Sequence, residues 1–233
     1  MGFGRRAARW VVRAVDAGPT RIWSQRRPEG RKSFKDDGAD LLAVVETIGR
    51  PVHLVGGSYG ATLALHMAAA EQSRLQSLAV FGPPLFAAGQ SIAPLLDRYA
   101  ALEREDAGEM STVLKDVTRG PPAIVAAFAA APGDKRPDPA EARRSAIGWL
   151  HDLEALTDDS TGTARWSSIT VPTLLMQGAD TWGPTPTTMN ELAAAIPTAR
   201  RVIWSRQSHF ATMTAPDLVA DALRDFFAGP DSR

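Results

Sequence analysis

One short segment of this 233-residue sequence combines a potential nucleophile with the glycines of a very tight turn. Ser58 lies within Gly56-Gly57-Ser58-Tyr59-Gly60, between the predicted strand 52–55 and a predicted helix. The G-x-S-x-G pattern between a strand and a helix is typical of a serine nucleophile on a strained turn. The N-terminus of that helix offers free backbone amides, and the Tyr59 N–H can stabilise a developing oxyanion. We assign Gly57 and Tyr59 to oxyanion or substrate binding.

Other glycine-rich motifs fail at single positions. A dinucleotide-binding G-x-G-x-x-G needs glycine at position 58 or 59, which hold serine and tyrosine. A phosphate-binding P-loop needs a lysine before Ser or Thr at the helix start, and Ala61-Thr62 offers none. The remaining structural alternative is that Ser58 only caps the helix. The complete pattern in its context favours the nucleophile.

A serine nucleophile needs a general base, and the sequence contains four histidines. His53 lies in the strand that leads to Ser58, His66 in the following helix, and His151 in the Ala-rich middle of the chain. His209 instead follows the last predicted strand, and catalytic groups gather at the carboxyl ends of parallel strands. We therefore predict that His209 is the base; the alternative is a solvated loop histidine.

Two further residues are candidates for the site. Asp180 follows another predicted strand, and its carboxylate could accept a hydrogen bond from the His209 imidazole and hold the useful tautomer. The alternative for Asp180 is a helix cap. Trp182 and the apolar middle of the chain suggest that the substrate carries a hydrophobic acyl or alcohol group. The alternative is that Trp182 or the middle segment belongs to the core.

The order of predicted elements places these residues on an α/β fold with a mostly parallel sheet flanked by helices. Apolar runs predict the strands, and 3.6-residue periodicity with caps predicts the helices. A Ser33–Asp36 capping box begins the first helix, and Gly49 and Pro51 end it. The predicted strands are 10–15, 52–55 (a compact, buried one), 75–81, 171–177 and 201–204, and the later helices are 61–70, 187–196 and 216–227.

The middle of the chain has a different character. Residues 85–166 are rich in alanine, leucine and charged residues and show no strand pattern, so we predict several short amphipathic helices there. We interpret this segment as a helical cap inserted into one domain, whose core is formed by residues 1–84 and 167–233.

Composition excludes several functional classes. Twenty-six Lys and Arg balance twenty-six Asp and Glu, which argues against a nucleic-acid partner. The absence of cysteine excludes a disulfide framework and a thiol nucleophile. The apolar runs are far shorter than the ~18 residues of a membrane span. We expect a cytoplasmic protein with a small-molecule substrate and neither a nucleic-acid nor a membrane partner.

These motifs together resemble the α/β-hydrolase fold family, in particular its bacterial esterase-like members with a helical cap. The matching segments are 52–61, 171–180 and 208–210, in the family's order Ser, Asp, His. The resemblance implies Ser58 as nucleophile, His209 as general base and then acid, and Asp180 as its orienter. It implies a serine hydrolase that cleaves a small apolar ester or related acyl compound through an acyl-enzyme, without a metal or other cofactor. Cofactor-free perhydrolysis or a lyase reaction would use the same residues and is the alternative chemistry.

The chain departs from the family pattern at the acid and on its N-terminal side. The family's acid commonly stands where this chain has Thr181, and the alternative position, after the strand 75–81, holds Gly82. About three strands and a His-Gly oxyanion loop normally precede the strand 10–15, so we expect an N-terminally incomplete fold. The alternative function is a catalytically impaired remnant that binds a ligand or partner, and an unpaired sheet edge favours a homodimer.

Overall fold

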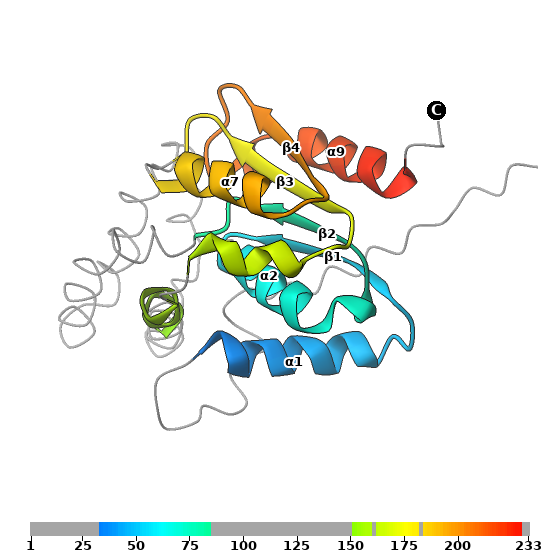
Figure 1. Cartoon of the computed structure of the whole chain (residues 1–233). Helices are drawn as coiled ribbons and strands as arrows, with labels where there is room; N and C mark the ends of the chain where they lie inside the picture. The colour runs from blue at the N-terminus through cyan, green and yellow to red at the C-terminus, as the bar shows by residue number, and fades with distance from the viewer. Residues whose placement is uncertain (1–32, 85–150, 160–161, 182–183, 230–233) are drawn as a thin grey trace, which may run out of the picture.

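The computed structural model describes residues 33–84, 151–159, 162–181 and 184–229. Within these residues four parallel strands form one sheet in the order β1-β2-β3-β4 (Figure 1). The strands are β1 (Val52–Gly57), β2 (Leu75–Phe81), β3 (Thr173–Gly178) and β4 (Ala199–Trp204). Because they run in the same direction, their carboxyl ends meet at one edge of the sheet, and Ser58 directly follows β1 there.

Helices cover both faces of this sheet (Figure 1). α1 (Phe34–Glu46), α2 (Tyr59–Glu71), α7 (Pro184–Ala195) and the 3₁₀ turn η2 (Thr163–Ser168) contribute to the core on one face. The short α8 (Ala211–Thr214) and α9 (Pro216–Ala228) pack on the other face. A 3₁₀ turn, η1 (Gln72–Arg74), extends α2, and residues 151–158 are helical. The predicted α/β fold with a parallel sheet between helices is confirmed.

The strand β2 shows why the two faces of the sheet form separate apolar cores. Its side chains alternate in direction, as in any strand. Leu78 and Val80 pack against α2 and α7 in one core, whereas Ala79 and Phe81 pack against α9 in the other. A strand that is apolar on both faces fits only the interior of a sheet, so β2 lies between β1 and β3.

The two edges of the described sheet are more exposed than the sequence predicts. The sequence predicts a buried strand at 52–55, and this is wrong for Val55, which is 49% exposed. Among the described residues β1 pairs with β2 alone, so one side of β1 has no neighbouring strand there. At the opposite edge, Ile203 of β4 is also 49% exposed.

Local sequence signals set the limits of α1. The N–H of Ser33 donates a hydrogen bond to the Asp36 carboxylate at 3.2 Å, and the Ser33 hydroxyl donates to the same oxygen at 2.7 Å. These contacts confirm the predicted capping box. After the helix, Gly49 adopts a φ of +68°, which costs glycine little, and Pro51 cannot continue the helix.

The other predicted strands and helices that fall on described residues also form, most of them with ends shifted by a few residues. The strand 75–81 matches at both ends, and the helix predicted at 187–196 corresponds to α7. The strand predicted at 10–15 and residues 85–150 of the predicted cap lie outside the described residues. Trp166, at the end of the predicted cap, is buried in the core between α2 and α7.

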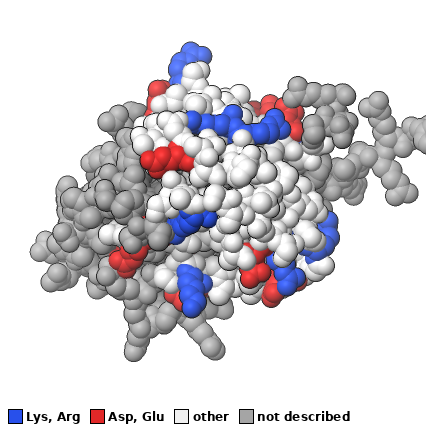
Figure 2. Space-filling model, in the orientation of Figure 1, with Lys and Arg blue, Asp and Glu red and all other residues white. Residues whose placement is uncertain are grey.

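The surface of the described part carries both signs of charge. On the face shown in Figure 2, Lys and Arg side chains are interspersed with Asp and Glu side chains and form no large patch of one sign. Among the described residues, no helix combines the length and the apolar character needed to cross a membrane.

Substitution of Gly178 tests how closely the backbone packs at the carboxyl ends of the strands. A Cβ atom there would overlap the Gln207 carbonyl group and lie 2.5 Å from the Ser208 carbonyl oxygen. We expect Gly178→Ala to lower the free energy of unfolding by about 3 kcal/mol, because backbone cannot easily yield. Gly38→Ala on α1 is the control: its Cβ would meet nothing within 4 Å, so it should stabilise the helix by about 0.5–1 kcal/mol. Urea unfolding measures both, and equal effects would contradict this packing.

Candidate functional site

Ser58 occupies a strained turn between β1 and α2. Its φ of 52° and ψ of −125° lie in a region that residues with a side chain rarely adopt. The turn is fixed on both sides, because the Ser58 N–H donates to the Phe81 carbonyl at 2.9 Å and the Ser58 carbonyl accepts from Ala61 N–H at 2.9 Å. A Cβ at Gly56 would lie 2.8 Å from the Ala61 Cα, which explains why the turn requires a glycine there. This geometry is the one predicted for a nucleophile.

The fold brings His209 to Ser58 across 151 residues of sequence. The His209 Nε2 lies 2.9 Å from the Ser58 Oγ. His209 belongs to the segment between β4 and α8, where the Ser208 Oγ accepts a hydrogen bond from Phe210 N–H at 3.1 Å and the Ser208 carbonyl accepts from Ala211 N–H at 3.2 Å. The fold therefore brings together the two side chains that the sequence predicts as nucleophile and base.

The environment of His209 favours a neutral imidazole. His209 is only 9% exposed, and burial lowers its pKa to about 4. With Nε2 accepting the Ser58 hydroxyl proton, the ring hydrogen of the neutral form resides on Nδ1. Among the described residues, Nδ1 has no hydrogen-bond partner. The histidine is thus held in the protonation state that a base requires, by desolvation and packing.

Gly82 packs directly against the imidazole of His209. It follows β2 with a φ of +52°, and a Cβ there would lie 2.9 Å from the His209 Nδ1 and 3.1 Å from Cε1. The Phe81 ring lies beside it, with its centroid 6.0 Å from that of His209. The position after β2 therefore accepts the imidazole only because it has no side chain, and it leaves no room for a carboxylate.

Asp180 is close to the His209 segment through its backbone. Its N–H donates to the Gln207 carbonyl at 2.9 Å, and the preceding Ala179 N–H donates to the Trp204 carbonyl at 2.9 Å. The Asp180 residue is exposed, and its carboxylate makes no hydrogen bond to His209 among the described residues. The orienting role of Asp180 stays a prediction. Thr181, one residue later, is the buried one, and its Oγ1 has no partner in the described part of the chain.

The remaining predicted site residues lie around the turn. Gly57 is exposed, and a Cβ added to it would meet nothing within 4 Å among the described residues. Tyr59 begins α2, where backbone N–H groups point away from the helix toward its N-terminus. Trp182 lies outside the described residues. No part of the described chain gathers three His, Asp or Glu side chains able to hold a metal ion.

The other three histidines have partners of their own. The His53 Nδ1 lies 2.7 Å from the Ser77 Oγ, and its ring lies 4.6 Å from that of Phe227; burial, followed by the nearby Arg50 charge, lowers the pKa of His53. His151 pairs with Glu154 at 3.0 Å, and the His66 Nε2 lies 3.2 Å from an Asp159 carboxylate oxygen.

Sequence reasoning missed one contact beside Ser58. The Tyr59 hydroxyl donates a 2.6 Å hydrogen bond to the carboxylate of Asp37, which is 3% exposed. The apolar spacing of α1 does indicate which face of the helix is buried, and Asp37 stands out as a carboxylate on that face. Nothing in the spacing indicates its partner, because Tyr59 lies on another helix.

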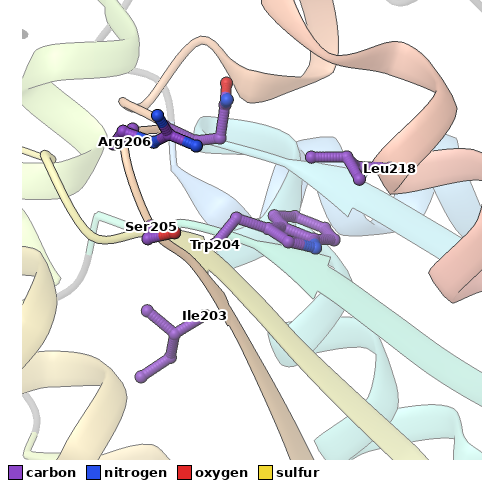
Figure 3. A pocket seen from close by; sticks show the side chains of 6 residues that line it. Ile203, Trp204, Ser205, Arg206 and Leu218 are labelled. Atoms are coloured by element: carbon purple, nitrogen blue, oxygen red, sulfur yellow. The ribbon is translucent and has the colours of Figure 1, made fainter.

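A shallow hollow of about 560 Å³ lies beside the outer edge of the described sheet rather than at Ser58 (Figure 3). Ile203 and Trp204 of β4 extend to opposite sides of the strand, and Leu218 of α9 lies on the side of Trp204. Ser205, Arg206 and Gln207 complete the lining. Neither Ser58 nor His209 lines this hollow, so it is separate from the catalytic candidates.

Comparison with known proteins assigns this arrangement to a family. The sequence matches the model of the alpha/beta hydrolase family over residues 2–222. Among solved structures, an alpha/beta hydrolase from Sphaerobacter thermophilus DSM 20745 is 30% identical, with a TM-score of 0.64 over 87% of this chain and 76% of that one. No curated protein matches.

Two more distant structures share the fold. The enol-lactonase from Burkholderia xenovorans LB400 is 20% identical, with a TM-score of 0.70 over 88% of this chain and 76% of that one. Est816, described as an N-acyl homoserine lactone degrading enzyme, is 22% identical, with a TM-score of 0.62 over 86% of this chain and 77% of that one. With the family model spanning most of the sequence, this chain belongs to the alpha/beta hydrolase family.

Proposed function

We propose that the protein is a serine hydrolase that cleaves small apolar esters, cyclic esters among them, through an acyl-enzyme. The observation that carries the proposal is the 2.9 Å contact between the Ser58 Oγ and the His209 Nε2 on a strained strand–helix turn. Membership of the family supports hydrolysis. The lactone-cleaving relatives support an ester carbonyl as the reacting group.

The first half of the reaction uses the contact directly. The Ser58 hydroxyl proton moves to the His209 Nε2 as the Oγ attacks the ester carbonyl carbon. The carbonyl electron pair moves onto its oxygen, and the Tyr59 N–H stabilises that oxyanion. Collapse of the tetrahedral intermediate breaks the bond to the alcohol, which leaves with the proton from Nε2.

The second half regenerates the serine. Water gives a proton to the His209 Nε2 and attacks the acyl carbon, and the bond to the Ser58 Oγ then breaks as that oxygen recovers the proton. The product is a carboxylic acid. A histidine that is neutral and buried in the resting enzyme suits the role of general base, because it accepts a proton only when the serine or water becomes nucleophilic.

A second candidate function is ligand or partner binding by a catalytically impaired hydrolase. The specific observation in its favour is that the His209 Nδ1 has no hydrogen-bond partner among the described residues. Without an orienting carboxylate the imidazolium formed during the reaction is less stabilised. This candidate and the enzyme differ in whether Ser58 reacts covalently.

Covalent labelling distinguishes the two functions. We expect a fluorophosphonate probe to label the wild type at Ser58, because His209 removes its proton, and we expect Ser58→Ala to remain unlabelled. Intact-protein mass spectrometry measures the adduct, and peptide mapping locates it. Ser205→Ala, which changes an exposed serine near β4, is the matched control and should label normally. A folded wild type that remains unlabelled would exclude the enzyme in favour of the binding protein.

The pH dependence of kcat/KM should reflect a histidine that stays neutral in acid. With the pKa of His209 lowered to about 4, we expect kcat/KM on a chromogenic ester to be constant down to about pH 5. Below about pH 4 it should fall about tenfold per pH unit. An acid limb near the ordinary histidine pKa of about 6.5 would contradict this and would indicate a carboxylate on Nδ1 in the reacting enzyme.

Stability over the same pH range needs its own measurement. Unfolded His209 binds a proton near pH 6.5, whereas the folded residue does so only near pH 4, so the unfolded state binds more protons between these values. Stability contributed by the neutral buried ring therefore decreases as the pH falls through that window. Circular dichroism at each pH separates loss of fold from loss of the base.

Substitution of Asp180 tests its predicted role. Because the exposed carboxylate makes no described hydrogen bond to His209, we expect Asp180→Asn to lower kcat by less than about tenfold, compared with ~10⁴ for loss of an orienting aspartate in a serine protease. Steady-state kinetics measures the change, with Asp217→Asn as an exposed control. A loss approaching 10³ or more would instead establish Asp180 as the orienter.

A further inference from the structure

A polar and aromatic cluster joins three segments directly beside the nucleophile turn. We call it the Tyr59 junction and define it as Phe34, Asp37, Tyr59, His66 and Asp159. Phe34 and Asp37 belong to α1, Tyr59 and His66 to α2, and Asp159 to the segment that follows the helical residues 151–158. None of these side chains belongs to the proposed reaction.

The strongest contact of the junction is the one between Tyr59 and Asp37. The Tyr59 hydroxyl donates to an Asp37 carboxylate oxygen at 2.6 Å, a length typical of a charge-assisted hydrogen bond. Burial raises the pKa of Tyr59, and the carboxylates of Asp37, Asp152 and Asp159 raise it further. The hydroxyl therefore keeps its proton and acts as a donor to a carboxylate that is only 3% exposed.

Phe34 holds the Tyr59 ring from the side. The Phe34 ring stacks on Tyr59 with centroids 4.9 Å apart and an interplanar angle of 21°, and it stacks on His66 at 4.6 Å and 15°. Phe34 is 5% exposed, so it is a buried wedge between two rings on the same face of α2. The start of α2 is thereby packed against the start of α1.

His66 extends the junction to the third segment. Its Nε2 lies 3.2 Å from an Asp159 carboxylate oxygen, and Arg165 donates two hydrogen bonds to that carboxylate, at 2.8 and 2.6 Å. Burial alone would raise the pKa of Asp159, but the hydrogen bonds from His66 and Arg165 outweigh it and lower the pKa. Arg165 in turn lies over the Trp166 ring, 4.0 Å from its centroid.

We propose that Asp37 is a positioning residue for the oxyanion-binding amide of Tyr59. This inference rests on the proposed function. Ser58 and Tyr59 share a peptide unit, so the direction of the Tyr59 N–H is tied to the strained backbone of Ser58. The Asp37–Tyr59 hydrogen bond fixes the side chain of the residue that carries this amide, and the Phe34 stack prevents its ring from moving sideways.

The expected consequence is kinetic rather than structural. A donor that stabilises an oxyanion is worth about 10²–10³ in turnover, and a small displacement forfeits part of that value. The substrate carbonyl in the ground state depends less on the donor than the oxyanion does. Loss of the Asp37–Tyr59 contact should therefore lower kcat while leaving KM nearly unchanged.

The test uses substitutions on both partners. Tyr59→Phe keeps the ring that stacks on Phe34 and removes only the hydroxyl, and Asp37→Ala removes the acceptor. We expect each to lower kcat on a chromogenic ester by about 10- to 100-fold with KM changed less than about threefold, and to weaken binding of a boronic-acid transition-state analogue by a similar factor. Asp37→Asn retains an acceptor oxygen and should recover most of the activity.

Controls separate positioning from general destabilisation. Asp40→Asn changes an exposed carboxylate on the same helix and should leave kcat and analogue affinity unaltered. Thermal unfolding by circular dichroism establishes that each variant is folded, and Tyr59→Phe serves if Asp37→Ala does not fold. If folded Tyr59→Phe retains wild-type kcat and analogue affinity, the positioning role of Asp37 is overturned.

One measurement does not depend on activity. Hydrogen exchange followed by mass spectrometry should show faster exchange of the backbone amides of residues 59–62 in Tyr59→Phe, because the first turn of α2 is less fixed. A wild type that is inert to the fluorophosphonate probe would refute the proposed function alone. With a wild type that the probe labels, unchanged kcat and analogue affinity in folded Tyr59→Phe would refute the Asp37 inference alone, whatever its exchange.

Discussion

The contact between the Ser58 Oγ and the His209 Nε2 depends on almost every other feature of the described structure. The two residues are 151 positions apart in the sequence, so only the tertiary fold brings them together. Ser58 adopts a backbone conformation that costs roughly 1–3 kcal/mol, which only a rigid surrounding can impose. The surrounding consists of β2, whose Phe81 carbonyl binds the Ser58 N–H, and α2, which begins at the next residue.

Close backbone approach is the second constraint on this site. Gly56, Gly82 and Gly178 each lie where an added Cβ would meet neighbouring atoms, respectively the start of α2, the His209 ring and the backbone after β4. These positions lie at the carboxyl ends of three different strands. The site is compact because glycine allows these segments to touch, and this compactness excludes water from His209. Burial then keeps the imidazole neutral, so the same packing sets both its position and its protonation state.

Much of the fold follows from patterns that are local in the sequence. The strand 75–81, the Ser33–Asp36 cap and the strand–turn–helix around Ser58 were all predictable, because apolar periodicity, capping and glycine placement act over a few residues. The exposure of Val55 was not, since it depends on whether another strand covers β1. The Asp37–Tyr59 hydrogen bond was not predictable either, because it joins two helices whose relative placement does not follow from local sequence patterns.

The sequence by itself determined the parallel α/β fold and the tight turn at Ser58, and it singled out His209 among four histidines as the candidate base. These follow from residue types whose spacing limits the backbone to a few conformations, and from the rule that parallel strands place their carboxyl ends together. Only the tertiary structure decided what surrounds the imidazole. It placed Gly82 beneath Nδ1, left the Asp180 carboxylate exposed and buried Thr181. The physical reason is that side-chain direction after a strand depends on long-range packing, which short-range spacing does not encode.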